Sequence, residues 1–156
     1  GYRLPIFQKR AKRQTVNHPK FYFFDTGVFQ VLRPKGFMDV PSEIDGVALE
    51  TLFLQSLRAI NDYWELDYEL CYWRTVSGVE VDFVLYGPNG FFAFEIKRSH
   101  NISSHDIKGL KSFKKDYPEA KTYLIYGGDK PYYMGDVTVL TMDFALKNLS
   151  SLLKPD

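Results

Sequence analysis

The chain has 156 residues, 45% hydrophobic and 25% charged, a balance typical of one globular domain with a sizeable core. Its net charge of +1 excludes a uniformly basic nucleic-acid binder but leaves room for a local basic patch. Its only cysteine, Cys71, excludes an intrachain disulfide and a cysteine-based zinc site. We expect Cys71 to be a small buried side chain in a reducing, cytoplasmic protein.

Several segments that would identify other classes of protein are missing from the sequence. It has no run of about 20 apolar residues, which a membrane-spanning helix needs, and no signal peptide. We therefore expect no membrane association. The sequence also has no G-x-x-x-x-G-K-[ST] loop, so we expect no ATP to be bound by these residues. The chain begins with Gly1 rather than Met, which is typical of a fragment or a trimmed chain.

Residues 1–19 are predicted to form a basic arm that precedes a single domain at 20–156. No Asp or Glu occurs before Asp25, whereas Lys and Arg are frequent there. Two interpretations remain open: a solvated, partly disordered tail, or an arm that contacts phosphates through Arg10, Lys12 and Arg13. The aromatic segment 20–24 then predicts a short strand, followed by a turn at 25–27.

A helix is predicted from Ser42 to about Ile60, with Ser42 and Asp45 as a capping box. Glu50 lies near the middle of its apolar arc, where an uncompensated carboxylate is costly. Glu50 therefore needs a cation, a hydrogen-bond network or a proton. Gly46, one turn earlier, would permit close approach of another backbone. The apolar arc consists of Val47, Phe53, Leu54 and Leu57.

An antiparallel meander is predicted from the strand-like segments 68–75, 79–86 and 91–97, the last two joined by a turn at 87–90. Alternation places Val79, Val81, Phe83 and Leu85 on one face of the second strand and Asp82 on the other. In the third, it separates Phe92, Phe94 and Ile96 from Glu95 and Lys97.

The remaining elements are a helix at 103–117, strands at 121–128 and 137–141, and a helix at 142–153. Ser103 and Asp106 form a second capping-box pattern. The expected buried positions are Ile107, Leu110 and Phe113 in the first helix, and Ala145, Leu149 and Leu152 in the second. The order predicts an α/β (α+β) fold with an αβββαβ core, in which a mixed central sheet is flanked by helices.

Charged residues on the meander converge in this fold. A hairpin would bring Asp82 and Glu95 to about 5 Å from each other, where two bare carboxylates repel. A divalent cation such as Mg²⁺ removes that repulsion. Lys97, on the same face as Glu95, can then orient a water or neutralise a phosphorane-like transition state. A bland alternative stays open, in which these are half-solvated strand residues and Asp82 caps a turn.

Asp82 and the following Glu95-Ile96-Lys97, with Glu50 on the preceding helix, resemble the PD-(D/E)xK phosphodiesterase superfamily. The segments KFYFFDTG, GVALETLFLQSL, GVEVDFVL and FEIKRS are similar to the DUF4143 family, typically the C-terminal part of prokaryotic AAA+-type ATPases. The similarity covers roughly residues 15 to 125, with Val81 in place of the motif's proline. A restriction-endonuclease-like fold is what the resemblance implies.

The resemblance also implies roles for individual residues. Asp82, Glu95 and the backbone carbonyl of Ile96 would bind Mg²⁺ or Mn²⁺, Lys97 would be the catalytic lysine, and Glu50 would complete the site. Arg98, Ser99 and Lys108 are further candidates for phosphate contacts at its lip.

Three functions follow as hypotheses. The first is a Mg²⁺-dependent nuclease domain that acts on DNA and is attached to an N-terminal ATPase domain. The second is a non-catalytic module that binds nucleic acid or protein. The third is a dimerisation domain, and the sequence leaves the oligomeric state open.

Overall fold

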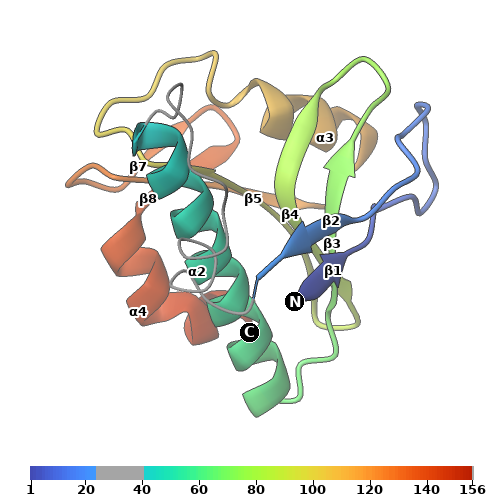
Figure 1. The fold of residues 1–156 in the computed structure, drawn as a ribbon, viewed down its shortest axis with the longest axis horizontal. Helices are drawn as coiled ribbons and strands as arrows, with labels where there is room; N and C mark the ends of the chain where they lie inside the picture. Colours follow the sequence, from blue (N-terminus) through green and yellow to red (C-terminus); the bar gives the residue numbers. More distant parts are fainter. Residues whose placement is uncertain (24–40, 156) are drawn as a thin grey trace.

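A mixed β-sheet forms the centre of the protein in the computed structural model, which describes residues 1–23 and 41–155, with side chains from residue 46 in the second range (Figure 1). The turn predicted at 25–27 and the capping box of Ser42 and Asp45 lie outside this described part. The strand order of the sheet is β3-β4-β5-β6-β8-β7. The strands are β3 (Glu69–Arg74), β4 (Glu80–Gly87), β5 (Gly90–Lys97), β6 (Lys121–Tyr126), β7 (Tyr132–Met134) and β8 (Val137–Thr141).

Strand direction changes across the sheet. The first three strands are antiparallel, as the predicted meander requires, and β5, β6 and β8 are parallel. The edge strand β7, which the sequence analysis did not predict, pairs antiparallel with β8. The predicted mixed sheet is therefore confirmed.

Helices cover both faces of this sheet (Figure 1). Helices α2 (Pro41–Tyr63) and α4 (Met142–Leu153) contribute to one apolar cluster, and α3 (Lys108–Asp116) contributes to another. The order α2-β3-β4-β5-α3-β6 confirms the predicted αβββαβ sequence of elements. In the last helix, Ala145 and Leu149 are buried as expected, whereas Leu152 is only half-buried and the next residue, Leu153, is fully buried instead.

The apolar arc of α2 is confirmed except at its start. Phe53, Leu54 and Leu57 are fully buried, whereas Val47 is 40% exposed. Within residues 1–23 and 41–155, no backbone makes the close approach predicted at Gly46, because no described atom outside its own helix turns lies within 4 Å of a Cβ built there. A helical wheel gives the direction of a side chain around the axis, but it does not show where along the axis packing begins.

Helix α3 begins at Lys108, five residues later than the predicted Ser103. Asp106 accepts a hydrogen bond from the backbone N–H of Ser103 at 2.8 Å, so half of the predicted capping box closes a turn before the helix. The predicted stripe of Ile107, Leu110 and Phe113 is buried.

Residues 1–19 pack along the outer edge of β3, so the solvated-tail interpretation of the basic arm is wrong. Strands β1 (Tyr2–Leu4) and β2 (Lys20–Tyr22) form an antiparallel pair. Between them, Phe7 donates its backbone N–H to Tyr72 O at 2.7 Å, and Val16 donates to Arg74 O at 3.1 Å. Backbone hydrogen bonds and the burial of Phe7 outweigh the positive charge of the arm, and they cover an otherwise open sheet edge.

Two expectations from composition also have structural outcomes. Cys71 is 1% exposed, which confirms it as a buried side chain. In the described ranges, no helix has the length and apolarity that a membrane crossing requires.

Gly109 sets the distance between α3 and β4. A Cβ at Gly109 would lie 2.2 Å from Glu80 O, a backbone atom that cannot rotate away. We therefore expect Gly109→Ala to lower the free energy of unfolding by about 2 kcal/mol. Gly46→Ala adds the same methyl group where no described atom lies within 4 Å, so it should leave stability unchanged or raise it by up to about 1 kcal/mol. Urea denaturation of both variants checks this, and equal effects would contradict the close packing of α3.

Candidate functional site

The candidate site lies at a fork where β4 and β5 separate. Their antiparallel pairing runs from Gly87↔Gly90 to Phe83↔Phe94. Beyond this point β5 continues to pair with β6 as far as Lys97, while β4 continues to pair with β3. Asp82 and Glu95 are the first residues past the last ladder pair, so they stand at the opening of the fork.

A β-bulge accounts for the divergence of β4. Val84 pairs with Cys71 and Val81 pairs with Trp73, so Asp82 and Phe83 together oppose Tyr72. Such an extra residue bends a strand and interrupts its alternation. The predicted single face is accordingly split: Val81 joins the cluster under α3, whereas Phe83 and Leu85 join the cluster under α2 and α4.

The side chains of Asp82 and Glu95 each accept a hydrogen bond from the backbone of the opposite strand, and these two bonds bridge the fork. Ile96 N donates a hydrogen bond to Asp82 Oδ2 at 2.8 Å. Asp82 N donates to Glu95 Oε2 at 3.4 Å. The side chains thus accept from amides that no longer have a ladder partner across the fork, which satisfies buried backbone donors. Asp82 and Glu95 are therefore close to each other, and Asp82 is buried, with an exposed fraction of 5%.

Glu50 joins this site from α2, as the sequence analysis predicted. Its Oε2 accepts a hydrogen bond from Tyr22 Oη at 3.0 Å. The charge of Glu50 raises the pKa of both Asp82 and Glu95, so the three carboxyl groups form one electrostatic cluster. The partner that a carboxylate on an apolar face requires is therefore a tyrosine hydroxyl, together with nearby lysines.

Two lysines face the acidic cluster. Lys97 Nζ lies 3.6 Å from Glu95 Oε1, so these residues form a salt bridge. Lys20, on β2, pairs with Glu80, whose Oε2 also lies 3.9 Å from Arg74 Nε. Burial would lower the pKa of Lys20, but the bond to Glu80 and the charges of Asp82 and Glu50 raise it overall. Lys20 is therefore held in its charged form.

The carboxyl groups of the cluster have raised pKa values. Burial is the largest cause for Asp82, and the charges of Glu95 and Glu50 raise its pKa further. Burial raises the pKa of Glu95 to about 7, although Lys97 acts in the opposite direction. Burial likewise raises the pKa of Glu50, against the effect of Lys20 and the bond from Tyr22. Burial thus outweighs the lysines and hydrogen bonds that favour the charged forms of these carboxyl groups.

Asp82 and Glu95 supply two adjacent carboxyl groups, the ligand type that Mg²⁺ takes from proteins. In the described part of the chain, no group of three or more His, Cys, Asp or Glu side chains is placed to hold a metal ion. Mg²⁺ keeps several waters and commonly uses only one or two carboxylates. Asp82 and Glu95, adjacent and raised in pKa by burial, have the oxygen chemistry that a divalent cation favours.

The residues predicted to bind nucleic acid lie in two regions. Arg98 and Ser99 are exposed just past Lys97, and Lys108 is exposed at the start of α3, whose backbone approaches Glu80 at Gly109. The other three belong to the arm: Arg13 pairs with Asp116 at 2.8 Å, and Arg10 and Lys12 line a separate pocket.

Sequence reasoning missed Lys20, Tyr22 and Glu80 as members of the cluster. The first two are separated by one residue on a short strand, a spacing that places them on one face. Glu80 precedes Asp82 by the same interval. Those spacings are the available signal, but only the packing of β2 beside Glu80 and Glu50 shows which face matters.

Comparison with protein families gives one match. The model of a family described as "Domain of unknown function (DUF4143)" matches residues 45–144. No curated protein and no solved structure matches the chain.

The raised pKa of Glu95 predicts a pH dependence of stability in metal-free protein. The folded state holds this proton up to about pH 7, whereas an ordinary glutamate loses it near 4.5. Between those values the folded state binds more protons, so the free energy of unfolding should fall as pH rises, on the order of 2 kcal/mol.

Urea denaturation in EDTA at a series of pH values measures this dependence. Glu95→Gln should make the decline shallower and raise stability above pH 7, because glutamine can accept the bond from Asp82 without a charge. The exposed Glu65→Gln is the matched control and should retain the wild-type slope. A wild-type stability that rises over this pH range would contradict the assignment.

Proposed function

This chain belongs to the DUF4143 family, and we propose that it is a Mg²⁺-dependent phosphodiesterase domain that acts on DNA. The observation that carries the proposal is the convergence of Asp82, Glu95 and Glu50 at the fork, beside Lys97. Acid-acid-lysine sets of this kind suit metal-assisted hydrolysis of phosphodiesters. The resemblance of FEIKRS to the PD-(D/E)xK motif supports the same conclusion.

Each side chain has a role in this proposal. Asp82 and Glu95 would hold Mg²⁺ or Mn²⁺, with the Ile96 carbonyl as a further ligand by resemblance to the superfamily. When bound, the ion supplies a Lewis acid and a water of lowered pKa. Lys97 neutralises charge that develops on the scissile phosphate.

Glu50 would position the site from α2. Its contact with Tyr22 Oη fixes one carboxyl oxygen, and the opposing charges of Lys20 and Lys97 keep the group close to the fork. The bond from Tyr22 and both lysines favour its charged form, but burial outweighs them and raises the pKa of Glu50 overall.

The environment of the fork favours a polyanionic substrate. Arg98 and Lys108 are exposed on the segments that follow Lys97 and open α3, so they contribute positive charge near the scissile group. By the same family resemblance, the domain would form the C-terminal part of an AAA+-type ATPase, with ATP bound by that other domain.

A second candidate is a non-catalytic binding module of such an ATPase. The observation that favours it is the use of both Asp82 and Glu95 as acceptors for backbone amides. In this function the fork is a structural clasp, and the basic surface binds nucleic acid or protein without a metal.

Cleavage assays test the first function. Purified protein should nick supercoiled plasmid in Mg²⁺ or Mn²⁺ and lose this activity in EDTA. Lys97→Ala should reduce the rate at least about 100-fold, because it removes the cation beside the reacting phosphate. Lys147→Ala removes an exposed lysine of α4 and should leave the rate unchanged. Equal rates for both variants would exclude the assigned role of Lys97.

Metal binding and DNA binding separate the two candidates. If the fork holds Mg²⁺, millimolar Mg²⁺ should raise the melting temperature of wild-type protein and not that of Asp82→Asn. A non-catalytic module would instead bind DNA in EDTA, with an affinity that falls as salt is added. Asp82→Asn would leave that affinity unchanged, and no DNA would be cleaved. Thermal melts and fluorescence anisotropy on the same preparations distinguish these outcomes.

A further inference from the structure

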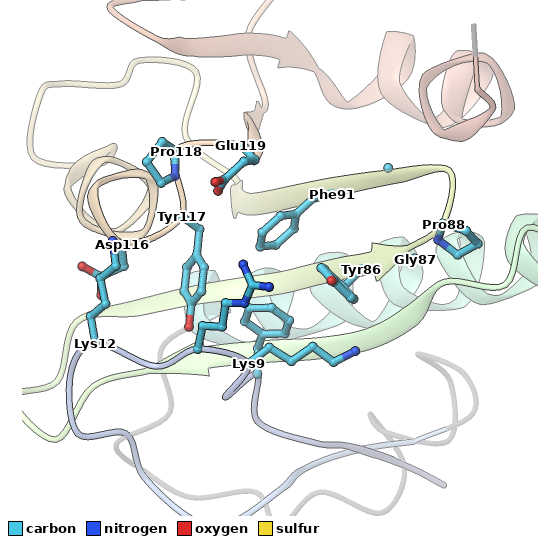
Figure 2. A pocket seen from close by; sticks show the side chains of 13 residues that line it. Lys9, Lys12, Tyr86, Gly87, Pro88, Phe91, Asp116, Tyr117, Pro118 and Glu119 are labelled. Atoms are coloured by element: carbon cyan, nitrogen blue, oxygen red, sulfur yellow. The ribbon is translucent and has the colours of Figure 1, made fainter.

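A pocket of about 830 Å³ lies between the basic arm, the turn of the β4–β5 hairpin and the C-terminal end of α3 (Figure 2). We refer to it as the arm pocket. It lies at the closed end of the hairpin, whereas Asp82 and Glu95 lie at its open end. The aromatic residues that line it are Phe7, Tyr86, Phe91 and Tyr117.

The aromatic side of the arm pocket is a continuous set of rings. The centroid of Phe7 lies 5.2 Å from that of Tyr117 and 5.4 Å from that of Phe91. Tyr86 and Phe91 meet edge to face at 5.2 Å and are only half-buried. Lys9 already lies over one face of Tyr86, so a planar ligand can contact the exposed part of Phe91 and whatever part of Tyr86 the lysine leaves open. Bases of any sequence stack on such surfaces.

The arm side of the rim carries positive charge, although Lys9 also pairs with Glu69 at 3.6 Å and Glu119 lines the opposite wall. Lys9 Nζ lies 4.2 Å above the centre of the Tyr86 ring. Arg10 and Lys12 are exposed, and within the described ranges neither has an ion-pair partner. Asp116 on the opposite wall is already paired with Arg13 at 2.8 Å. The side of the pocket formed by the arm therefore suits an anionic group, and phosphate is the anion that accompanies a base.

Tyr117 adds a polar group that lacks a partner. It is 6% exposed, and its hydroxyl is the buried side-chain polar atom that finds no hydrogen bond among the described residues. Figure 2 shows its ring among the lining side chains, with the hydroxyl directed towards the arm. Buried hydroxyl groups normally bond to a polar atom, so this unbonded hydroxyl, shielded from solvent, lowers the stability of the packing behind the pocket wall.

Helix α3 connects the arm pocket to the fork. Its first turn approaches Glu80 at Gly109, and its last residue, Asp116, lines the pocket. Its nine residues span about 13 Å. Lys108, Lys111 and Lys115 are exposed along this length.

We propose that the arm pocket binds an unpaired nucleotide of a single-stranded nucleic acid, with the base against Tyr86 and Phe91 and the phosphate at Arg10 and Lys12. This inference deepens the proposed function, because a strand held there can follow the lysines of α3 to the fork. The binding step itself needs neither metal nor cleavage, so it can be tested separately.

Fluorescence anisotropy with a labelled 12-nucleotide oligothymidylate in EDTA is the test. Arg10→Glu with Lys12→Glu should weaken binding at least about tenfold, because two phosphate contacts become repulsive. Lys147→Glu with Lys154→Glu makes the same change of net charge on and just after α4, on the other side of the sheet, and should change affinity less than twofold. All four side chains are charged and outside the core, so these variants should fold.

Two variants test the base site. Tyr86→Leu should weaken binding about fivefold or more, whereas Tyr133→Leu, at a 78% exposed tyrosine on β7, should have no effect. Tyr117→Phe should leave binding unchanged and raise the melting temperature of the free protein, because it removes an unbonded buried hydroxyl that the ligand does not reach. An oligonucleotide with abasic sites should bind more weakly than the intact one.

Several results would overturn the proposal. These are equal affinities for the two double charge variants, duplex DNA bound as tightly as the single strand, or thymidine monophosphate alone bound as tightly as the oligonucleotide. Cleavage separates this failure from that of the proposed function. If the protein cleaves DNA but Arg10→Glu with Lys12→Glu leaves its oligonucleotide affinity unchanged, the arm-pocket proposal alone is refuted. If the protein cleaves nothing but the oligonucleotide affinities of the variants follow the predicted order, the phosphodiesterase proposal is refuted and the arm-pocket proposal is supported.

Discussion

The exchange of hydrogen bonds between Asp82 and Glu95 across the β4–β5 fork is the interaction on which the candidate site depends. Two strands that separate inside a sheet expose amide groups to an interior that cannot solvate them. Here the amides of Asp82 and Ile96 are satisfied by carboxylates from the opposite strand. The fork therefore requires side chains with hydrogen-bond acceptors at these positions for its own stability, whatever chemistry they also perform.

Carboxyl groups in this role create an electrostatic imbalance that the neighbouring elements reduce. A third acid, Glu50, approaches from α2, and burial penalises all three charges. Lys97 from β5, Lys20 from β2 and the hydroxyl of Tyr22 act against that penalty. Elements distant in sequence thus supply positive charge and hydrogen-bond donors to the same three carboxyl groups. A divalent cation at the fork would add further positive charge.

Local sequence patterns predicted much of this structure because they depend on few neighbours. Period-two alternation located the meander, and the unusual position of Glu50 on an apolar arc correctly indicated a buried polar cluster. The bulge at Asp82 and Phe83 was not predictable, since it depends on the register with β3. The solvated tail, one of the two interpretations left open for the arm, was wrong because it rested on charge, whereas backbone bonds to β3 and the burial of Phe7 decide the position of the arm. Lys20 and Tyr22 were missed for the same reason, since a strand of three residues has no pattern that identifies its partners.

The position of β2 has a practical consequence for any attempt to shorten the chain. The family match begins at residue 45, but Lys20 and Tyr22 precede it and are held by pairing with β1 near the other end of the arm. A protein trimmed to the matched residues would retain Asp82, Glu95 and Lys97. It would nevertheless lose the cation beside Glu80, the hydroxyl beside Glu50 and the cover over the edge of β3. Such a truncation is prone to intermolecular strand pairing, and a lack of activity in it would say little about the intact site.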